Sequence, residues 1–175
     1  MTDNIRNASA IAEEVLKELE IERPPVDPLE IAKDEGLIVV FATFERNLST
    51  VSGFYDPEDR KIYVNENEDP YQQRFTLAHE LGHHFLHRQW AHSEDYKVLL
   101  RGEIDEITQY DVEANEFASN LLMPKFMLDR YRDLPIETLF KLFAVSIHAI
   151  ENRIMKTHGN RSKKGEGGNY RRADH

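Results

Sequence analysis

Residues 74–87 read RFTLAHELGHHFLH and contain the motif His-Glu-x-x-His, formed by His79, Glu80 and His83. Apolar residues fill most of the other positions, so the segment predicts a buried α-helix over about residues 72–88. Residues four apart on a helix lie on the same face, with Cβ atoms about 5–6 Å apart. The two imidazoles can therefore each point a nitrogen at one Zn²⁺ at about 2.0–2.1 Å.

The alternative interpretation is a helix that carries these histidines by chance. With average residue usage, His-Glu-x-x-His arises by chance in a chain of this length in roughly 1% of cases or fewer. Two histidines and a glutamate in an apolar helix need polar partners, and a metal ion supplies them. We therefore favour a metal site in which Glu80 reaches a water molecule and acts as general base. Gly82 costs about 1 kcal/mol of helix propensity relative to Ala. Close approach by another helix is the expected compensation; the alternative is that the glycine is merely tolerated.

The third protein ligand of a zinc site must be a carboxylate or another histidine, because the sequence contains no cysteine. A second helix is predicted over about residues 108–122. Ala114 and Ala118 give it a small-residue face suited to packing against the first helix, and Asp111 lies on that face. Glu113 lies about 200° from Asp111 round the helix and is the alternative third ligand.

Two further polar residues are candidates for supporting the metal ligands. Asn115 follows Asp111 by one turn, where its amide can orient a ligand or a histidine. His87 follows His83 by one turn, but histidines at i, i+4 and i+8 diverge too far for all three to reach one ion, so we assign His87 a supporting or packing role. The remaining histidines before the last 17 residues are expected to be exposed or to cap helices: His84, His92, His148 and His158.

Residues 74–87 together with VEANEFASNLLMP (residues 112–124) resemble the ImmA/IrrE family of metallopeptidases. Weaker matches upstream, in PPVDPLEIAKDEGLIVV, VSGFY and IYVN, extend the resemblance to about residues 8–157. In that family the two histidines bind zinc, the glutamate between them is the catalytic base and an acidic residue of the second helix completes the site. The corresponding position here, four before the Asn of the Ala-Asn pair, is Asp111, where Glu is the commoner residue; Glu113 stays the alternative.

The patterning predicts an α+β fold: a small antiparallel three-stranded sheet packed on a zincin-like bundle of helices with a central His-Glu-x-x-His helix. Helical periodicity over about residues 8–20 is followed by a short helix from the N-cap Asp27 to about Asp34. Three β-type runs come next, and a turn-rich connection suggests that the last two form a hairpin; the runs are 37–41, 51–55 and 61–64.

Length favours a single zinc metallopeptidase domain over residues 1–158. Within it we expect the sheet at about 37–65, the catalytic helices at about 72–122 and two C-terminal helices at about 136–157. Residues 159–175 contain five basic and two acidic residues and predict a disordered basic tail.

The net charge of −10 argues against a general nucleic-acid binder, which is normally basic. The C-terminal helices have helix-turn-helix spacing, but the second is expected to expose a set with little positive charge: His148, Glu151, Asn152 and Arg153. Ordinary packing is therefore favoured over DNA binding. With neither a signal peptide nor a membrane span in the sequence, we expect a soluble, cytoplasmic protein.

These features predict a zinc-dependent endopeptidase with one Zn²⁺ per chain. The strand Val51, Ser52, Gly53, Phe54 and Tyr55 is the candidate for binding an extended peptide by strand addition. The family resemblance implies that the substrate is a helix-turn-helix (XRE-type) transcriptional repressor, cut to derepress stress or mobile-element genes. The alternative is a catalytically silent metal-binding regulator or antitoxin that acts by protein binding; a DNA-binding factor is a third class.

Overall fold

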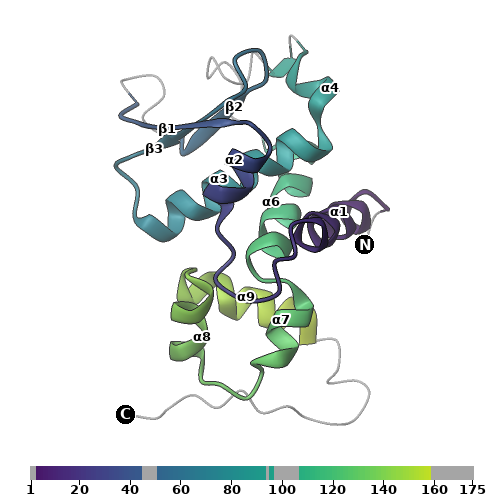
Figure 1. The fold of residues 1–175 in the computed structure, drawn as a ribbon, viewed down its shortest axis with the longest axis vertical. Coiled ribbons are helices and arrows are strands. Elements are labelled where there is room, and N and C mark those ends of the chain that lie inside the picture. Colours follow the sequence, from purple (N-terminus) through teal and green to yellow (C-terminus); the bar gives the residue numbers. More distant parts are fainter. Residues whose placement is uncertain (1–2, 45–50, 94, 97–106, 159–175) are drawn as a thin grey trace.

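Helix α3 (Pro70–Leu86) lies at the centre of the computed structural model, between a small β-sheet and helix α6 (Gln109–Leu122) (Figure 1). The structure describes residues 3–44, 51–93, 95–96 and 107–158. The expected α+β class is confirmed. The other helices in these residues are α1 (Asp3–Glu18), α2 (Pro28–Asp34), α4 (Arg88–Ala91), α7 (Lys125–Arg130), α8 (Ile136–Phe143) and α9 (Ile147–His158).

The start of α3 is fixed by Asp69, whose carboxylate accepts hydrogen bonds from the backbone N–H groups of Tyr71 (2.9 Å) and Gln72 (3.2 Å). Pro70 occupies the first helical turn, where its missing N–H costs nothing. Asp-Pro therefore starts the helix two residues before the hydrophobic pattern does.

Close packing between α3 and α6 explains the glycine within the motif. A Cβ atom at Gly82 would lie 2.9 Å from Cα and 3.1 Å from Cβ of Ala114. The expected close approach by another helix is confirmed, and it brings Asp111, at the start of α6, towards the two motif histidines.

The sheet is mixed, and the prediction of an antiparallel sheet is wrong for one strand. Strand β2 (Gly53–Asp56) pairs antiparallel with β3 (Lys61–Asn65) as the expected hairpin. Strand β1 (Ile38–Ala42) pairs parallel with β3, and the strand order is β1-β3-β2. Turn residues fix only the pairing of adjacent strands, whereas the direction of β1 depends on tertiary packing. Strand β2 thus forms one edge of the sheet.

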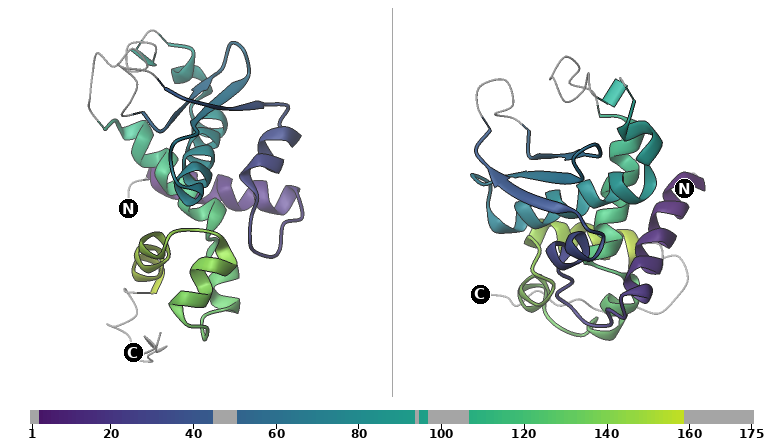
Figure 2. Two further views of the ribbon diagram at one scale, coloured as in Figure 1. Left: turned by 90° about the vertical axis from the view of Figure 1, so that its left-hand side faces the viewer. Right: turned by 45° about the horizontal axis from the view of Figure 1, so that its top comes forward.

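The C-terminal helices gather at the end of α6 that lies away from the sheet (Figures 1 and 2). Pro124 ends α6 as expected, but the short helix α7 begins directly after it, which the sequence pattern did not predict. Arg153 is buried rather than exposed: it is 5% accessible and lies 3.6 Å from the carboxylate of Glu116. The last helix therefore packs through a polar group that we expected on its surface.

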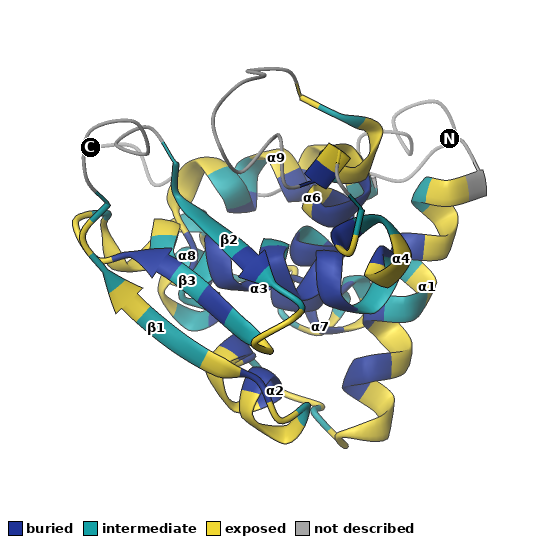
Figure 3. Cartoon of the chain, turned by 90° about the horizontal axis from the view of Figure 1, so that it is seen from above, coloured by how far each residue is buried: buried dark blue, intermediate teal, exposed yellow. Residues whose placement is uncertain are grey.

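Buried residues concentrate where α3 and α6 face each other and the sheet (Figure 3). Leu81, Phe117 and Leu121 are fully buried there. Each such side chain stabilises the fold by about 1.5–3 kcal/mol relative to leaving it exposed. None of the helices described is both long and apolar enough to span a bilayer.

Candidate metal centre

The two motif histidines present their Nε2 atoms to the same point. One turn of α3 separates His79 from His83, and their Nε2 atoms are 3.1 Å apart. His83 is 3% accessible, and burial lowers its pKa to about 4. The imidazole is therefore neutral near pH 7, which is the form that binds metals.

Asp111 brings the candidate third ligand atom from α6. Its Oδ1 lies 3.8 Å from Nε2 of His79 and 3.6 Å from Nε2 of His83. In the described part of the chain, His79, His83 and Asp111 form a group of three potential metal ligands. One nitrogen or oxygen atom of each lies within 4.8 Å of the other two. Ligands at about 2.0–2.1 Å from a tetrahedral zinc lie about 3.3 Å apart. The sides of the triangle, 3.1, 3.6 and 3.8 Å, are close to that spacing.

The second oxygen of Asp111 holds the side chain in place. Oδ2 accepts hydrogen bonds from the backbone N–H (2.7 Å) and the hydroxyl (2.6 Å) of Thr108, the N-cap of α6. Although burial raises the pKa of Asp111, its contacts with His79, His83 and Thr108 hold that pKa well below its usual value. The carboxylate is charged and oriented before any metal binds.

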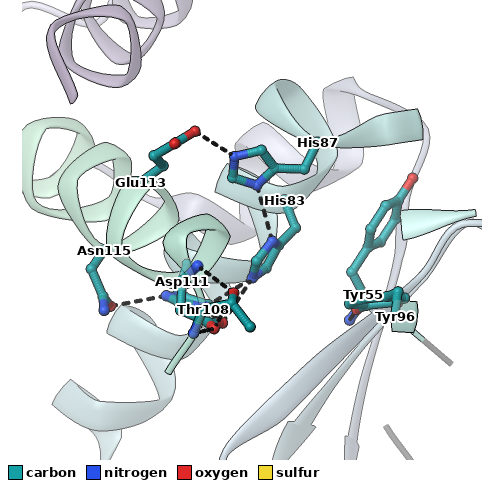
Figure 4. A network of polar contacts seen from close by, with 9 residues as sticks. Tyr55, His83, His87, Tyr96, Thr108, Asp111, Glu113 and Asn115 are labelled. Atoms are coloured by element: carbon teal, nitrogen blue, oxygen red, sulfur yellow. Dashed lines mark hydrogen bonds and ion pairs between the residues drawn. The ribbon is translucent and has the colours of Figure 1, made fainter. Parts of the chain in front are cut away.

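Glu113, the alternative third ligand, lies apart from this group. Its Oε2 is 3.0 Å from Nε2 of His87 (Figure 4). Its Oε1 accepts hydrogen bonds from Asn4 and Gln109. His87 in turn lies behind His83, with 3.1 Å between their Nδ1 atoms. The arrangement gives Glu113 a partner other than the metal site.

Asn115 lies beside the first histidine. Its Oδ1 is 2.9 Å from Nδ1 of His79, on the far side of the ring from Nε2. An amide oxygen in this position accepts a hydrogen bond from the Nδ1–H group and leaves Nε2 free for a metal. This is the orienting geometry that the helix spacing predicts.

Glu80 faces the same cleft from the neighbouring position on α3. It is 5% accessible, and burial raises its pKa to about 7, partly opposed by the charge of His79 and by a backbone hydrogen bond from Tyr55. A carboxylate with this pKa can both take and return a proton near neutral pH.

The three candidate ligands and Glu80 line a cleft of about 340 Å³. Residues 51–54, which belong to the predicted peptide-binding strand, form part of its wall. Tyr55 differs: its side chain is buried, and its backbone N–H and C=O both bond to the hydroxyl of Tyr96, at 3.1 and 2.7 Å. Tyr96 thus covers the edge of β2 at that point.

Sequence reasoning missed three residues of the site. Trp90 and Tyr96 line the cleft from the segment after α3, which has no periodicity that could have indicated it. Thr108 had a local signal, because Thr-x-x-Asp at residues 108–111 has the spacing of a capping box.

One histidine expected at the surface is buried. His84 is 1% accessible, with Nδ1 2.9 Å from the hydroxyl of Tyr55 and Nε2 3.1 Å from a carboxylate oxygen of Glu35. It joins the sheet and α2 to α3, so it belongs to the fold. His148 is exposed as expected and contacts Asn152.

Comparison with known proteins agrees with this geometry. The IrrE N-terminal-like domain of the Peptidase M78 family matches residues 32–155, well over half of the chain. The chain is 38% identical to the radiation response metalloprotease IrrE of Deinococcus deserti over 80 residues, which is 44% of this chain and 27% of that protein. It is 34% identical to immunity region protein 2 of Bacillus phage phi105 over 85 residues, 47% of this chain and 51% of the relative.

The chain thus matches only about half or a quarter of the length of these relatives. In three dimensions it resembles a Mycobacterium tuberculosis transcriptional regulator with a TM-score of 0.60, at 19% identity, over 86% of this chain and 46% of that one. This likeness concerns the fold. The sequence match over both helices of the site confirms the resemblance noted above: the chain belongs to the Peptidase M78 family, through a domain of the IrrE N-terminal-like type.

Proposed function

We propose that this protein is a zinc-dependent endopeptidase with one metal ion per chain, held by His79, His83 and Asp111, and with Glu80 as general base. The observation that supports this most is the triangle of ligand atoms, 3.1, 3.6 and 3.8 Å on its sides, beside a buried carboxylate in one cleft. Two histidines and one carboxylate are a known ligand set of catalytic zinc, which leaves a coordination position open.

When bound, a zinc ion supplies Lewis acid chemistry, because it lowers the pKa of a water molecule towards 7 and polarises a carbonyl group. The chain supplies the proton transfers. Glu80 accepts a proton from the attacking water at a carboxylate oxygen and then donates it to the leaving amine. Its burial keeps the carboxylate pKa close to the value that both transfers need.

The edge of β2 is the proposed binding surface for an extended peptide. The backbone C=O of Ser52 accepts a hydrogen bond from Asn65 of β3, while the N–H and C=O of Tyr55 bond to Tyr96 on the opposite side. Because hydrogen-bonding directions alternate along a strand, the N–H and C=O of Gly53 point to the free edge, beside the cleft. A Cβ at Gly53 would lie 2.5 Å from Thr76, so the glycine also lets the strand sit close to α3.

The substrate we propose is a helix-turn-helix transcriptional repressor of XRE type, whose cleavage would derepress stress or mobile-element genes. The name of the phage relative, which places it in an immunity region, supports a partner of this kind. The net charge of −10 suits a basic protein partner. The single domain over residues 1–158 and the cytoplasmic location remain predictions, and the tail at 159–175 lies outside the described residues.

Exchange of Glu80 for glutamine tests the proposed activity. We expect Glu80→Gln to retain about one zinc per chain but to cleave the regulator encoded beside its gene 10²- to 10⁴-fold more slowly, roughly the contribution of a general base. Metal analysis and a gel-based cleavage assay measure the two effects, with the exposed Glu137→Gln as matched control.

Cleavage by Glu80→Gln at the wild-type rate would remove Glu80 from the mechanism. If the wild-type protein binds the regulator without cutting it, and Glu80→Gln derepresses the regulator's target genes as strongly as the wild-type protein does, the protein is the silent metal-binding regulator instead.

A further inference from the structure

A line of hydrogen bonds runs away from the metal centre behind His83. Nδ1 of His83 lies 3.1 Å from Nδ1 of His87, and Nε2 of His87 lies 3.0 Å from Oε2 of Glu113 (Figure 4). The three side chains come from α3, the residue that ends it, and α6. All are buried, with accessibilities of 3%, 5% and 8%.

Glu113, at the end of this line, is itself held on both sides. Its Oε1 accepts hydrogen bonds from Nδ2 of Asn4 at 3.0 Å and from Nε2 of Gln109 at 2.8 Å. Asn4 belongs to α1, which packs along α6. The position of the carboxylate is therefore fixed by α1 and by the first residue of its own helix, α6.

Aromatic rings enclose the middle of the line. Trp90 and Tyr110 stack with 4.2 Å between ring centroids, and each packs edge-on against His87, at 6.1 and 5.1 Å. Apolar ring faces supply no alternative hydrogen-bond partners, so the imidazole of His87 depends on His83 and Glu113.

The positions of the ring nitrogens allow one arrangement of protons. If Nε2 of His83 binds the metal, its Nδ1 carries the proton, and this N–H group donates a hydrogen bond to His87. Nδ1 of His87 must then be unprotonated. Its Nε2 therefore carries the proton, and this N–H group donates a hydrogen bond to Glu113. A carboxylate, which only accepts hydrogen bonds, is the partner that enforces this order.

We propose that Glu113 is a positioning residue of the metal centre, which acts through His87 to fix the ring orientation and tautomer of His83. The inference rests on the proposed metal site and assigns the second acidic residue of α6 a task distinct from that of Asp111. Partners of this kind typically change metal affinity 10- to 100-fold when removed, whereas loss of a ligand costs more.

The test is a double-mutant cycle on zinc affinity, measured by competition with a chromogenic chelator. We expect His87→Ala and Glu113→Ala each to weaken zinc binding 10- to 100-fold, and the double variant to be no weaker than the weaker single variant, because the two residues act in series. Asp111→Ala should lose affinity well beyond this range. Glu113→Gln should lie between wild type and Glu113→Ala, because its amide oxygen can still accept from His87 while its NH2 group then faces the donors Asn4 and Gln109.

Imidazole ¹⁵N NMR of the zinc-loaded wild-type protein reads the tautomers directly, whatever the variants do to folding. The inference requires His83 protonated at Nδ1 and His87 protonated at Nε2. The Nδ1-protonated form of His87 would overturn it, as would wild-type zinc affinity in Glu113→Ala, or multiplicative losses in the double variant.

Two results would point elsewhere. A loss in Glu113→Ala as great as in Asp111→Ala would overturn the inference by making Glu113 a direct ligand. If the wild-type protein binds zinc no better than His79→Ala, the proposed metal site itself fails, and this outcome is distinct from failure of the positioning role.

Discussion

At the scale of single residues, the two oxygens of Asp111 have different tasks. One faces the motif histidines at 3.6 and 3.8 Å, and the other accepts two hydrogen bonds from Thr108. Asp is a methylene shorter than Glu. This length lets one residue in the first turn of α6 both accept hydrogen bonds from the N-cap residue and face the metal centre. The shorter side chain therefore needs the N-cap as a support.

Exchange of Thr108 tests this dependence. We expect Thr108→Val, which keeps the shape but removes the hydroxyl, to destabilise the protein by about 0.5–2 kcal/mol through loss of the cap. Zinc affinity should also fall, by about 10-fold or more, because the carboxylate loses a support. Urea unfolding of the metal-free protein and chelator competition measure the two effects.

Thr108→Ser provides the control, since it keeps the hydroxyl and should keep both properties near wild type. An unchanged zinc affinity in Thr108→Val, at reduced stability, would limit Thr108 to capping.

At the scale of elements, a buried ion pair fixes the last helix to the catalytic region. Arg153 on α9 lies 3.6 Å from Glu116 on α6 and donates to the backbone oxygen of Met123 at 3.0 Å. Glu116 also accepts a hydrogen bond from Ser9 on α1 at 3.3 Å. Three helices therefore share one polar network. Its central residue, Glu116, lies on α6, the helix that also carries Asp111.

Removing one partner of this pair should be costly. We expect Arg153→Met to lower the free energy of unfolding by about 3–5 kcal/mol, because it leaves the carboxylate of Glu116 buried without its main counter-ion. Lys156→Met is the matched control: Lys156 also reaches Glu116, at 3.4 Å, but its side chain is 63% accessible, so the loss should stay below about 1 kcal/mol. Equal losses in urea unfolding would contradict a special role for the buried pair.

At the scale of the whole molecule, the metal centre joins parts of the chain that are far apart in sequence. Its candidate ligands come from α3 and α6, its cleft includes the edge of β2, and the line of hydrogen bonds behind His83 ends at α1. A ligand that binds only the folded arrangement must stabilise all of it together.

Zinc should therefore raise the melting temperature of the intact protein. At a free zinc concentration 100 times the Kd, the gain is about 2.7 kcal/mol, which for a chain of this size corresponds to a shift of about 5–10 °C. Differential scanning calorimetry with and without chelator measures it. His79→Ala should abolish the shift, while the exposed His148→Ala should keep it; a shift that survives in His79→Ala would place the ion elsewhere.

Local patterns carried much of the prediction. The motif spacing and helical periodicity predicted α3, α6 and the pair of histidines, because each depends on residues at most four apart. The glycine at position 82 similarly predicted a close helix contact, which Ala114 provides. The hairpin of β2 and β3 followed from the turn between them.

The errors concern relations between distant segments. The direction of β1, the burial of His84 and that of Arg153 all depend on which element packs against each residue. From the sequence, a histidine or arginine is predicted to lie at the surface. It can be buried when the fold places a carboxylate from another helix or loop beside it. The positions of Trp90 and Tyr96 in the cleft were not predicted for the same reason: they depend on tertiary packing, and their segment has no periodic pattern.

The sequence by itself therefore determined the family, the α+β class and the helix that carries the His-Glu-x-x-His motif, since these rest on short-range spacing. Only the tertiary structure separated the two acidic residues of α6. A helix turn brings both within reach of α3, but packing at Gly82 directs Asp111 towards His79 and His83, while α1 and His87 hold Glu113 on another side. The physical reason is that a carboxylate's role depends on the groups that surround it, and the partners that distinguish the two residues, the motif histidines for Asp111 and His87 and Asn4 for Glu113, lie more than 20 residues away in the sequence.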